Sequence, residues 1–240
     1  MRLISLVPSQ TELLVDLGLR EQLVGVTKFC VHPVDIRQTA TVVGGTKNYD
    51  FAKIAALEPD LIIGNKEENE RTGIEQLVAR YPVWISNISN LPEALSMIQT
   101  VGELTGTTVR AAALAADIAE CFAALPAAPS PQTVAYFIWR KPYMVAAAGT
   151  FIDDMLARAG FHNAFADRTR YPAISAEELV RAAPEQIFLS SEPYPFAAKH
   201  VAEFQALCPA ASIDIVDGEL FSWYGSRLRL TPAYLAGLRR

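Results

Sequence analysis

The sequence predicts an α/β protein of two lobes, each with a mostly parallel sheet, joined by one long rigid α-helix. Three observations lead to this prediction: a motif that occurs twice, strands that are continuous apolar runs, and a mid-chain helical segment too long for a connection within one lobe. The chain's 240 residues are enough for two small domains. We expect an N-terminal lobe at 1–90, the linking helix at 91–126 and a C-terminal lobe at 127–240.

The repeated motif consists of a short helix, a proline and a strand. Asp50 and Ser175 each precede an amphipathic segment, which is the position of an N-cap residue. Pro59 and Pro184 end these segments. An acidic residue follows each proline and leads into an apolar run that is typical of a buried strand. Two related halves predict a ligand site in the cleft between them.

The first half alternates between strand and helix. Ser9 and Glu12 are spaced as a capping box, and Gly18 stands where a C-cap glycine is expected. The strands are runs of Leu, Ile and Val, which favours a parallel sheet covered on both faces. The predicted strands are 3–7, 23–26, 41–43, 60–64 and 83–86, and the predicted helices are 9–18, 50–57 and 70–80.

Between Pro92 and Leu125 the apolar residues recur at helical spacing. A single helix of this length spans about 50 Å, and the proline-rich segment 126–131 after it is typical of a linker. The second half then returns to the first pattern, which predicts a Rossmann-like arrangement in both lobes. Its expected elements are strands 133–139, 186–190 and 213–217, an apolar segment 143–147, and helices 151–159, 175–183, 197–207 and one from about Pro232.

Charge and composition exclude several classes of function. The net charge of -5 and the absence of a Lys/Arg block argue against a nucleic-acid partner. The most apolar long stretch, 111–124, is interrupted by charged residues, so we expect no membrane span. No secretory leader is recognisable, which predicts a cytoplasmic protein, or a periplasmic one if a leader has been removed. The three cysteines suggest no disulfide framework.

The candidate site residues lie in loops that follow the predicted strands. Ligands of open α/β sheets bind beyond the carboxyl ends of the strands. Aromatic faces with a few polar groups suit a large, flat organic ligand. The candidates with these properties are Phe29, Lys66, Glu67, Trp139, Arg140, Tyr171, Trp223, Tyr224 and Arg227.

Cys30 and His32 form the sharpest local signal. A thiolate and an imidazole two residues apart in a loop are both able to reach one metal ion. The alternative is a buried small cysteine beside a loop histidine. A Cys–His nucleophile is a further alternative, but it needs an oxyanion hole and an orienting residue that the sequence does not identify.

Several motifs resemble one family in their combined order. They are segment 2–13, Val24-Gly25-Val26, segment 54–63, the long mid-chain helix and Trp223-Tyr224. This order resembles the substrate-binding proteins of ABC importers of the cobalamin and iron-siderophore type, the helical-backbone metal receptor group of class III periplasmic-binding-protein-like folds. The resemblance implies a monomeric binding protein, not an enzyme, with a corrinoid, iron-siderophore or haem-like chelate held between two lobes on one rigid helix.

The resemblance also implies roles for single residues. Phe29, Tyr171 and Trp223 match positions that surround the ligand. Glu177 matches one of two glutamates that dock on an ABC permease, and Asp50 is the acidic residue nearest to the other position. A cytoplasmic relative without a permease is an alternative, and so is an enzyme or metal-binding protein that uses Cys30 and His32 on the same scaffold.

Overall fold

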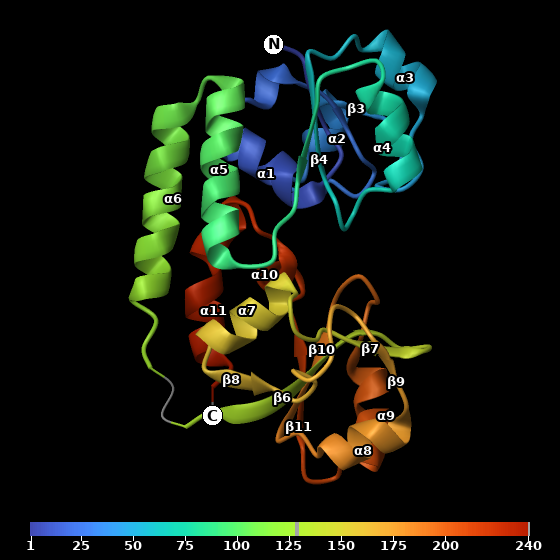
Figure 1. Ribbon diagram of the computed structural model, residues 1–240, viewed down its shortest axis with the longest axis vertical. Coiled ribbons are helices and arrows are strands. Elements are labelled where there is room, and N and C mark those ends of the chain that lie inside the picture. Colours follow the sequence, from blue (N-terminus) through green and yellow to red (C-terminus); the bar gives the residue numbers. More distant parts are fainter. Residues whose placement is uncertain (128–129, 240) are drawn as a thin grey trace. The chain divides into compact units, whose positions relative to one another are not determined.

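The structure is a computed structural model that describes residues 1–127 and 130–239 and consists of two compact units (Figure 1). Unit 1 comprises Met1–Ile88, Pro92–Glu120 and Tyr224–Arg229, and unit 2 comprises Ser89–Leu91, Cys121–Trp223 and Leu230–Arg240. Each unit has its own mostly parallel sheet, so the predicted α/β class with two lobes is confirmed. Ala128 and Pro129 of the predicted linker lie outside the described residues.

The sheet of unit 1 has five parallel strands in the order β3-β2-β1-β4-β5. Its strands are β1 (Leu3–Ser5), β2 (Leu23–Val26), β3 (Thr41–Val42), β4 (Leu61–Asn65) and β5 (Val83–Ser86). Helices α3 (Phe51–Ala56) and α4 (Arg71–Val78) cover one face, where Ile54 and Leu77 join a fully buried core with strand residues. Short helices η1 (Arg20–Gln22) and α2 (Ile36–Thr39) lie in the connections.

Helix α1 (Pro8–Asp16) covers the opposite face, where Thr11 Oγ1 donates to Ser5 Oγ at 2.8 Å. Gly18 follows the helix with φ +84°, the left-handed conformation expected of a C-terminal glycine. The predicted Ser9–Glu12 capping box is wrong. Val7 is the N-cap and makes no side-chain cap, because the helix begins at Pro8, which places Ser9 inside its first turn.

The single long helix that we predicted is also wrong, because the segment forms two helices. α5 (Leu91–Thr105) and α6 (Thr108–Ala123) are separated at Gly106, whose φ of +71° ends the first helix. The two helices lie side by side (Figure 1), and a Cβ added at Gly102 would come within 2.3 Å of the Ala111 Cβ. Every helix among the described residues is too short or too polar to cross a bilayer.

The sheet of unit 2 has the order β11-β10-β6-β7-β9, and β8 pairs with β6. Pairing is parallel from β11 to β6 and antiparallel at β7 and β9. Its strands are β6 (Gln132–Trp139), β7 (Tyr143–Val145), β8 (Phe161–Asn163), β9 (Ala173–Ile174), β10 (Gln186–Ser190) and β11 (Ser212–Val216).

Two helix layers enclose the sheet of unit 2. On one face, Leu179 and Phe204 pack on buried strand residues such as Phe137. On the other, Tyr136 packs against Phe221 with ring centroids 4.9 Å apart. The helices are α7 (Phe151–Arg158), α8 (Ala176–Ala182), α9 (Ala198–Leu207), α10 (Glu219–Ser222) and α11 (Thr231–Gly237), and η2 (Ser226–Arg229) belongs to unit 1.

The predicted repeat is present in both sequence and structure. Asp50 Oδ1 accepts the Lys53 N–H at the start of α3, and Ser175 caps α8 in a complete capping box with Glu178. The helices lead into β4 and β10, which pair in parallel with the first strand of their own unit. In both copies the residue before the proline is left-handed: Glu58 has φ 43° and Ala183 has φ 41°.

Candidate functional site

In unit 1, hydrogen bonds tie together the loops that follow three strands. The Lys28 N–H, after β2, donates to the Gly44 carbonyl, after β3, at 2.8 Å. Asn69 Nδ2, after β4, donates to the Thr46 carbonyl at 3.0 Å. Asn69 Oδ1 in turn accepts the Asn65 N–H at 2.7 Å. The carboxyl edge of this sheet is therefore one connected surface.

Cys30 lies beneath this edge rather than on it. Its side chain is 0% exposed, and Thr11 Oγ1 donates to Sγ at 3.0 Å. Burial raises the pKa of the Cys30 thiol, although the bonds with Thr11 and Thr27 act in the opposite direction. A neutral, enclosed thiol is a poor metal ligand and a poor nucleophile. This placement favours the alternative of a buried structural cysteine, and the predicted metal contact at Cys30 stays a prediction.

Phe29 and His32, the neighbours of Cys30, lie closer to the surface. The Phe29 ring is 50% exposed, and Lys28 Nζ lies 5.0 Å from its centroid, within cation–π range. His32 is partly buried. No group of three or more His, Cys, Asp or Glu suited to a metal ion occurs in residues 1–127 and 130–239. A bare-ion site built on Cys30 and His32 therefore has no further ligands within the described structure.

Tyr224 and Arg227 belong to unit 1 and are engaged there. The Tyr224 hydroxyl donates to Glu68 Oε1 at 2.9 Å. Arg227 donates twice to the Glu12 carboxylate, at 2.9 and 2.7 Å, and both side chains are less than 20% exposed. The guanidinium thus forms an ion pair within unit 1, and the predicted ligand-binding role of Arg227 stays a prediction. Lys66 is exposed and Glu67 is partly buried in the loop after β4.

In unit 2, the loop after β6 presents an aromatic surface. Trp139 is 40% exposed and packs edge-on against Tyr194, with ring centroids 5.5 Å apart. Arg140 donates to Glu203 Oε2 through two nitrogens, at 2.9 and 2.6 Å, and the Tyr143 hydroxyl donates to the other oxygen. The ligand contact of Trp139 stays a prediction, and Arg140 is held by a carboxylate of α9.

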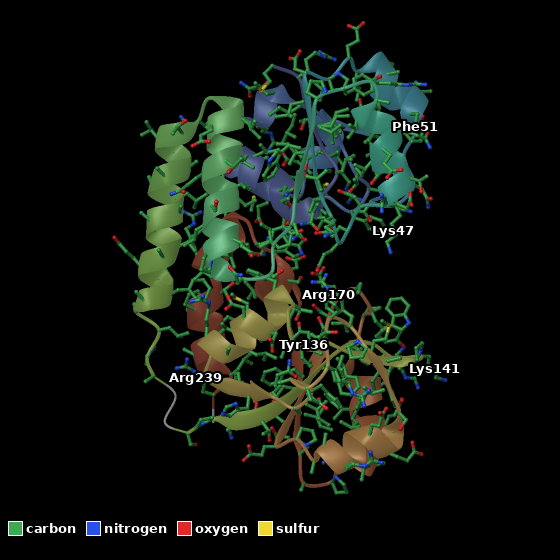
Figure 2. All side chains as sticks on the ribbon, in the orientation of Figure 1. Lys47, Phe51, Tyr136, Lys141, Arg170 and Arg239 are labelled. Carbon is green, nitrogen blue, oxygen red and sulfur yellow. The ribbon has the colours of Figure 1, made fainter. Side chains whose placement is uncertain are left out.

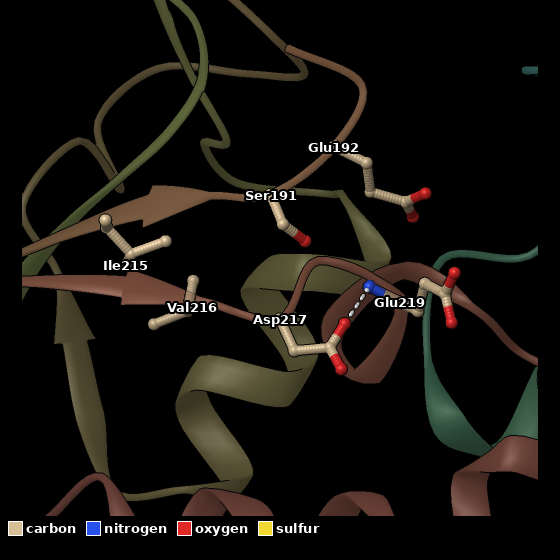
Figure 3. A pocket seen from close by; sticks show the side chains of 6 residues that line it. All are labelled: Ser191, Glu192, Ile215, Val216, Asp217 and Glu219. Carbon is tan, nitrogen blue, oxygen red and sulfur yellow. Dashed lines mark hydrogen bonds between the residues drawn. The ribbon is translucent and has the colours of Figure 1, made fainter. Parts of the chain in front are cut away.

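A pocket of about 470 Å³ opens where β10 and β11 end (Figure 3). Its walls carry three acidic side chains, Glu192, Asp217 and Glu219, and the Glu219 N–H donates to Asp217 Oδ1 at 3.0 Å. Glu192 Oε1 accepts from Trp223 Nε1 at 2.9 Å and from Ser222 Oγ at 2.8 Å. Burial raises the pKa of Glu192, with Glu219 and Asp217 acting in the same direction.

The remaining predicted residues lie at the surface of their own units. Tyr171 is partly buried, with the Arg170 guanidinium carbon 5.6 Å from its ring centroid. Glu177 is exposed in the first turn of α8. The Asp50 carboxylate caps α3 and also lies 3.6 Å from Lys53 Nζ. The roles of these three residues in ligand binding and docking stay predictions.

Sequence reasoning missed Lys28, Lys47 and Glu192 as candidates. All three follow carboxyl ends of strands, at positions that the sequence already indicated. The overlooked signal was the scarcity of lysine, which makes lysines in adjacent strand-end loops unusual. For Glu192 the signal was weaker, because its burial depends on Ser222 and Trp223, which are distant in sequence.

A family model described as periplasmic binding protein matches residues 3–207. The chain belongs to the periplasmic binding protein family. It is 27% identical over 240 residues to the vitamin B12-binding protein of Pectobacterium carotovorum subsp. carotovorum, covering 95% of this chain and 84% of that one. The periplasmic haem-binding protein of Roseiflexus sp. RS-1, in apo form, has a TM-score of 0.85 at 22% identity, covering 100% and 99% of the two chains.

A periplasmic haem-binding protein of Pseudomonas aeruginosa gives a similar result. Its TM-score is 0.83 at 25% identity, with 99% of this chain and 92% of that chain covered. These likenesses confirm the predicted family and the fold of two α/β units. The related proteins are binding proteins by name.

Proposed function

We propose that this protein binds a metal chelate, of the corrinoid, haem-like or siderophore type, as the substrate-binding component of an ABC-type importer. Family membership carries the proposal, because relatives named for vitamin B12 and haem binding share the sequence pattern or the fold along nearly the whole chain. The alternative of an enzyme based on Cys30 loses support from the enclosed thiol.

Aromatic rings at the strand-end loops support a flat ligand. Phe29 in unit 1 and Trp139 in unit 2 are 50% and 40% exposed, although large aromatic side chains usually bury most of their surface. Stacking against such rings contributes about 0.5–1.5 kcal/mol beyond the area buried. We therefore assign the two rings to ligand contact, each at the carboxyl edge of its own sheet.

Equilibrium titration tests this function. We expect visible absorbance of haemin, cyanocobalamin or a ferric siderophore to shift on binding, with one of them bound in the micromolar range or tighter. Phe29→Ala and Trp139→Ala should each weaken binding about 10-fold. Val109→Ala is the control, because Val109 is 84% exposed on α6, away from the strand ends. If no chelate binds, or if the two aromatic variants bind as the parent does, the proposal is wrong.

A further inference from the structure

His200 is a buried histidine in the first turn of α9, three residues after the N-cap residue Ala197. The Ala197 N–H donates to His200 Nδ1 at 2.9 Å. In a capping box a Glu or Gln side chain makes this bond, and in α8 the Glu178 carboxylate makes it with the Ser175 N–H at 2.7 Å. In α9 the same backbone acceptor is therefore a titratable imidazole.

The backbone donor determines which nitrogen of the His200 ring carries the proton. Because the Ala197 N–H can only donate, Nδ1 is the nitrogen without a proton, and the proton of the neutral ring is on Nε2. Nε2 lies 3.3 Å from the Tyr194 hydroxyl oxygen, so the Nε2–H donates to that oxygen. One nitrogen thus holds the start of the helix, and the other holds a tyrosine.

Tyr194 connects this cap to the exposed ring of Trp139. The centroids of the two rings lie 5.5 Å apart in an edge-on arrangement, and the Tyr194 ring also packs on Phe196. The Tyr194 N–H donates to the Ile138 carbonyl, one residue before Trp139. Figure 2 shows Lys141 in the turn after β6, and its carbonyl accepts from Trp139 Nε1 at 3.2 Å. Trp139 therefore has two supports, its own turn and Tyr194.

Protonation of His200 is incompatible with the cap. Histidine changes its charge between about pH 8 and pH 5, and both nitrogens of an imidazolium are donors. The new Nδ1–H would face the Ala197 N–H, so two donors would meet and the bond would be lost. Within residues 1–127 and 130–239, no carboxylate accepts from either ring nitrogen of His200. Nothing in that part of the chain replaces the lost bond.

The other charged groups around this site have partners of their own. Arg140 and the Tyr143 hydroxyl both donate to the Glu203 carboxylate, and Arg140 also interacts with the Tyr194 hydroxyl. Glu192, two residues before Tyr194, has a pKa raised by burial, so its titration needs a control. The remaining titratable groups on α9, on the elements packed against it and in their loops are Lys141, Glu177, Glu178, Arg181, Lys199, Cys208 and Asp214.

We infer that His200 is a positioning residue for the ligand-contacting ring of Trp139, and that protonation of His200 releases this ring. The inference rests on the proposed chelate-binding function, in which Trp139 contacts the ligand. On acidification the cap at Ala197 opens, the segment 194–197 loosens, and Trp139 keeps only the support of its own turn. Chelate affinity therefore falls toward acidic pH, and it falls through His200.

NMR of the protein without ligand tests the positioning. A long-range ¹H–¹⁵N correlation spectrum shows which nitrogen of His200 carries the proton, and we expect Nε2 at pH 8. With fluorotryptophan incorporated, the Trp139 fluorine signal is assigned by its loss in Trp139→Phe. Between pH 8 and pH 5 this signal should move with the midpoint of the His200 ring, whereas the Trp84 signal should not. Glu192→Gln should retain the movement, which excludes the neighbouring carboxyl group as its cause.

Affinities for cyanocobalamin, haemin and ferrichrome at pH 8 and pH 5 test the consequence for binding. In the parent we expect binding about 10-fold weaker at pH 5, which is the loss expected for Trp139→Ala. His200→Gln keeps an oxygen that accepts the Ala197 N–H but does not titrate, so its two affinities should agree within about 2-fold. His162→Gln removes an exposed imidazole from β8 and should keep the parent's loss. Comparison with the parent cancels any titration of the ligand.

The outcomes separate the inference from the function. If Nδ1 carries the proton at pH 8, or if the Trp139 signal does not follow His200, the inference is wrong whether or not a chelate binds. If chelates bind with the same pH dependence in the parent and in His200→Gln, the inference is wrong and the chelate-binding function stands. If no chelate binds at either pH, the function is wrong, and the NMR measurements on the parent still decide whether His200 positions Trp139. Melting temperatures establish that the variants fold.

Discussion

At the scale of single residues, Glu192 is the clearest case of a carboxyl group whose pKa is changed by its surroundings. Its Oε1 accepts from Ser222 and Trp223, yet burial raises the pKa of this carboxyl group above the ordinary value of about 4.3. A raised pKa means that the folded protein binds the proton more tightly than the unfolded chain does. The contribution of Glu192 to stability is therefore fully present below that ordinary pKa and is lost as pH rises through the folded pKa.

Glu192→Gln should therefore stabilise the protein relative to the parent at pH 7. The amide keeps an oxygen that accepts from Trp223 and Ser222 but removes the buried charge. We expect the variant's melting temperature to exceed the parent's at pH 7 and the gap to shrink toward pH 4. Glu120→Gln, an exposed position on α6, is the control. A gap that is constant between pH 4 and 7 would contradict this account.

Residue types in the loops were predictable, but their partners were not. Arg227 and Arg140 stand in strand-end loops as expected, yet Glu12 and Glu203 neutralise them from far along the chain. Cys30 was placed correctly in a loop, but no local pattern reveals that Thr11 and Thr27 enclose its sulfur. Charge pairing and burial depend on tertiary contacts, and single-sequence reasoning does not reach them.

At the scale of elements, the same capping pattern occurs twice with different results. Ser175 and Glu178 form a complete capping box at α8. Ser9 and Glu12 have the same spacing, but Ser9 Oγ is buried without a hydrogen bond and Glu12 is paired with Arg227. A pattern of residue types does not show whether the glutamate caps its own helix or forms an ion pair with an arginine far along the chain.

This difference predicts the stability of three variants. Ser175→Ala and Asp50→Ala should each lower the free energy of unfolding by about 1 kcal/mol, because each removes a cap from an exposed helix start. Ser9→Ala should cost little or nothing, because its hydroxyl makes no bond. Denaturant unfolding measures all three. A Ser9→Ala loss as large as that of Ser175→Ala would contradict the assigned caps.

In the mid-chain segment, the periodicity of apolar residues predicted helical structure but not the boundary between the two helices. Apolar spacing predicted helical structure throughout the segment, and both α5 and α6 are helical. The break at Gly106 was missed because a glycine within a helical pattern is compatible with either a bend or a stop. The φ of +71° at Gly106 ends α5. The close approach of Gly102 to Ala111 means that α6 then runs back alongside α5.

At the scale of the whole molecule, the repeat was the most reliable signal. It predicted two α/β units, their parallel strands and the caps at Asp50 and Ser175, because each of these depends on local sequence. The antiparallel strands β7 and β9 were not predicted as a pair, because their pairing joins segments separated by a helix. The predicted cleft between the lobes stays a prediction.

The proposed docking on an importer involves the whole molecule, but a substitution at one residue tests it. Glu177 is exposed in the first turn of α8, and its docking on a permease is a prediction from the family resemblance. Glu177→Lys should lower chelate uptake by cells of the source organism at least about 10-fold and leave chelate affinity unchanged. Glu120→Lys is the control, with the same charge change on α6. Normal uptake by cells carrying Glu177→Lys would argue against docking at this residue.

Native mass spectrometry with a visible spectrum tests chelate binding most directly. The protein is purified from its own source and measured before and after addition of haemin, cyanocobalamin and a ferric siderophore. We predict a complex of one polypeptide with chelate, coloured and stable through the measurement, for at least one of these ligands. A spectrum showing the bare polypeptide mass under every condition would contradict the account.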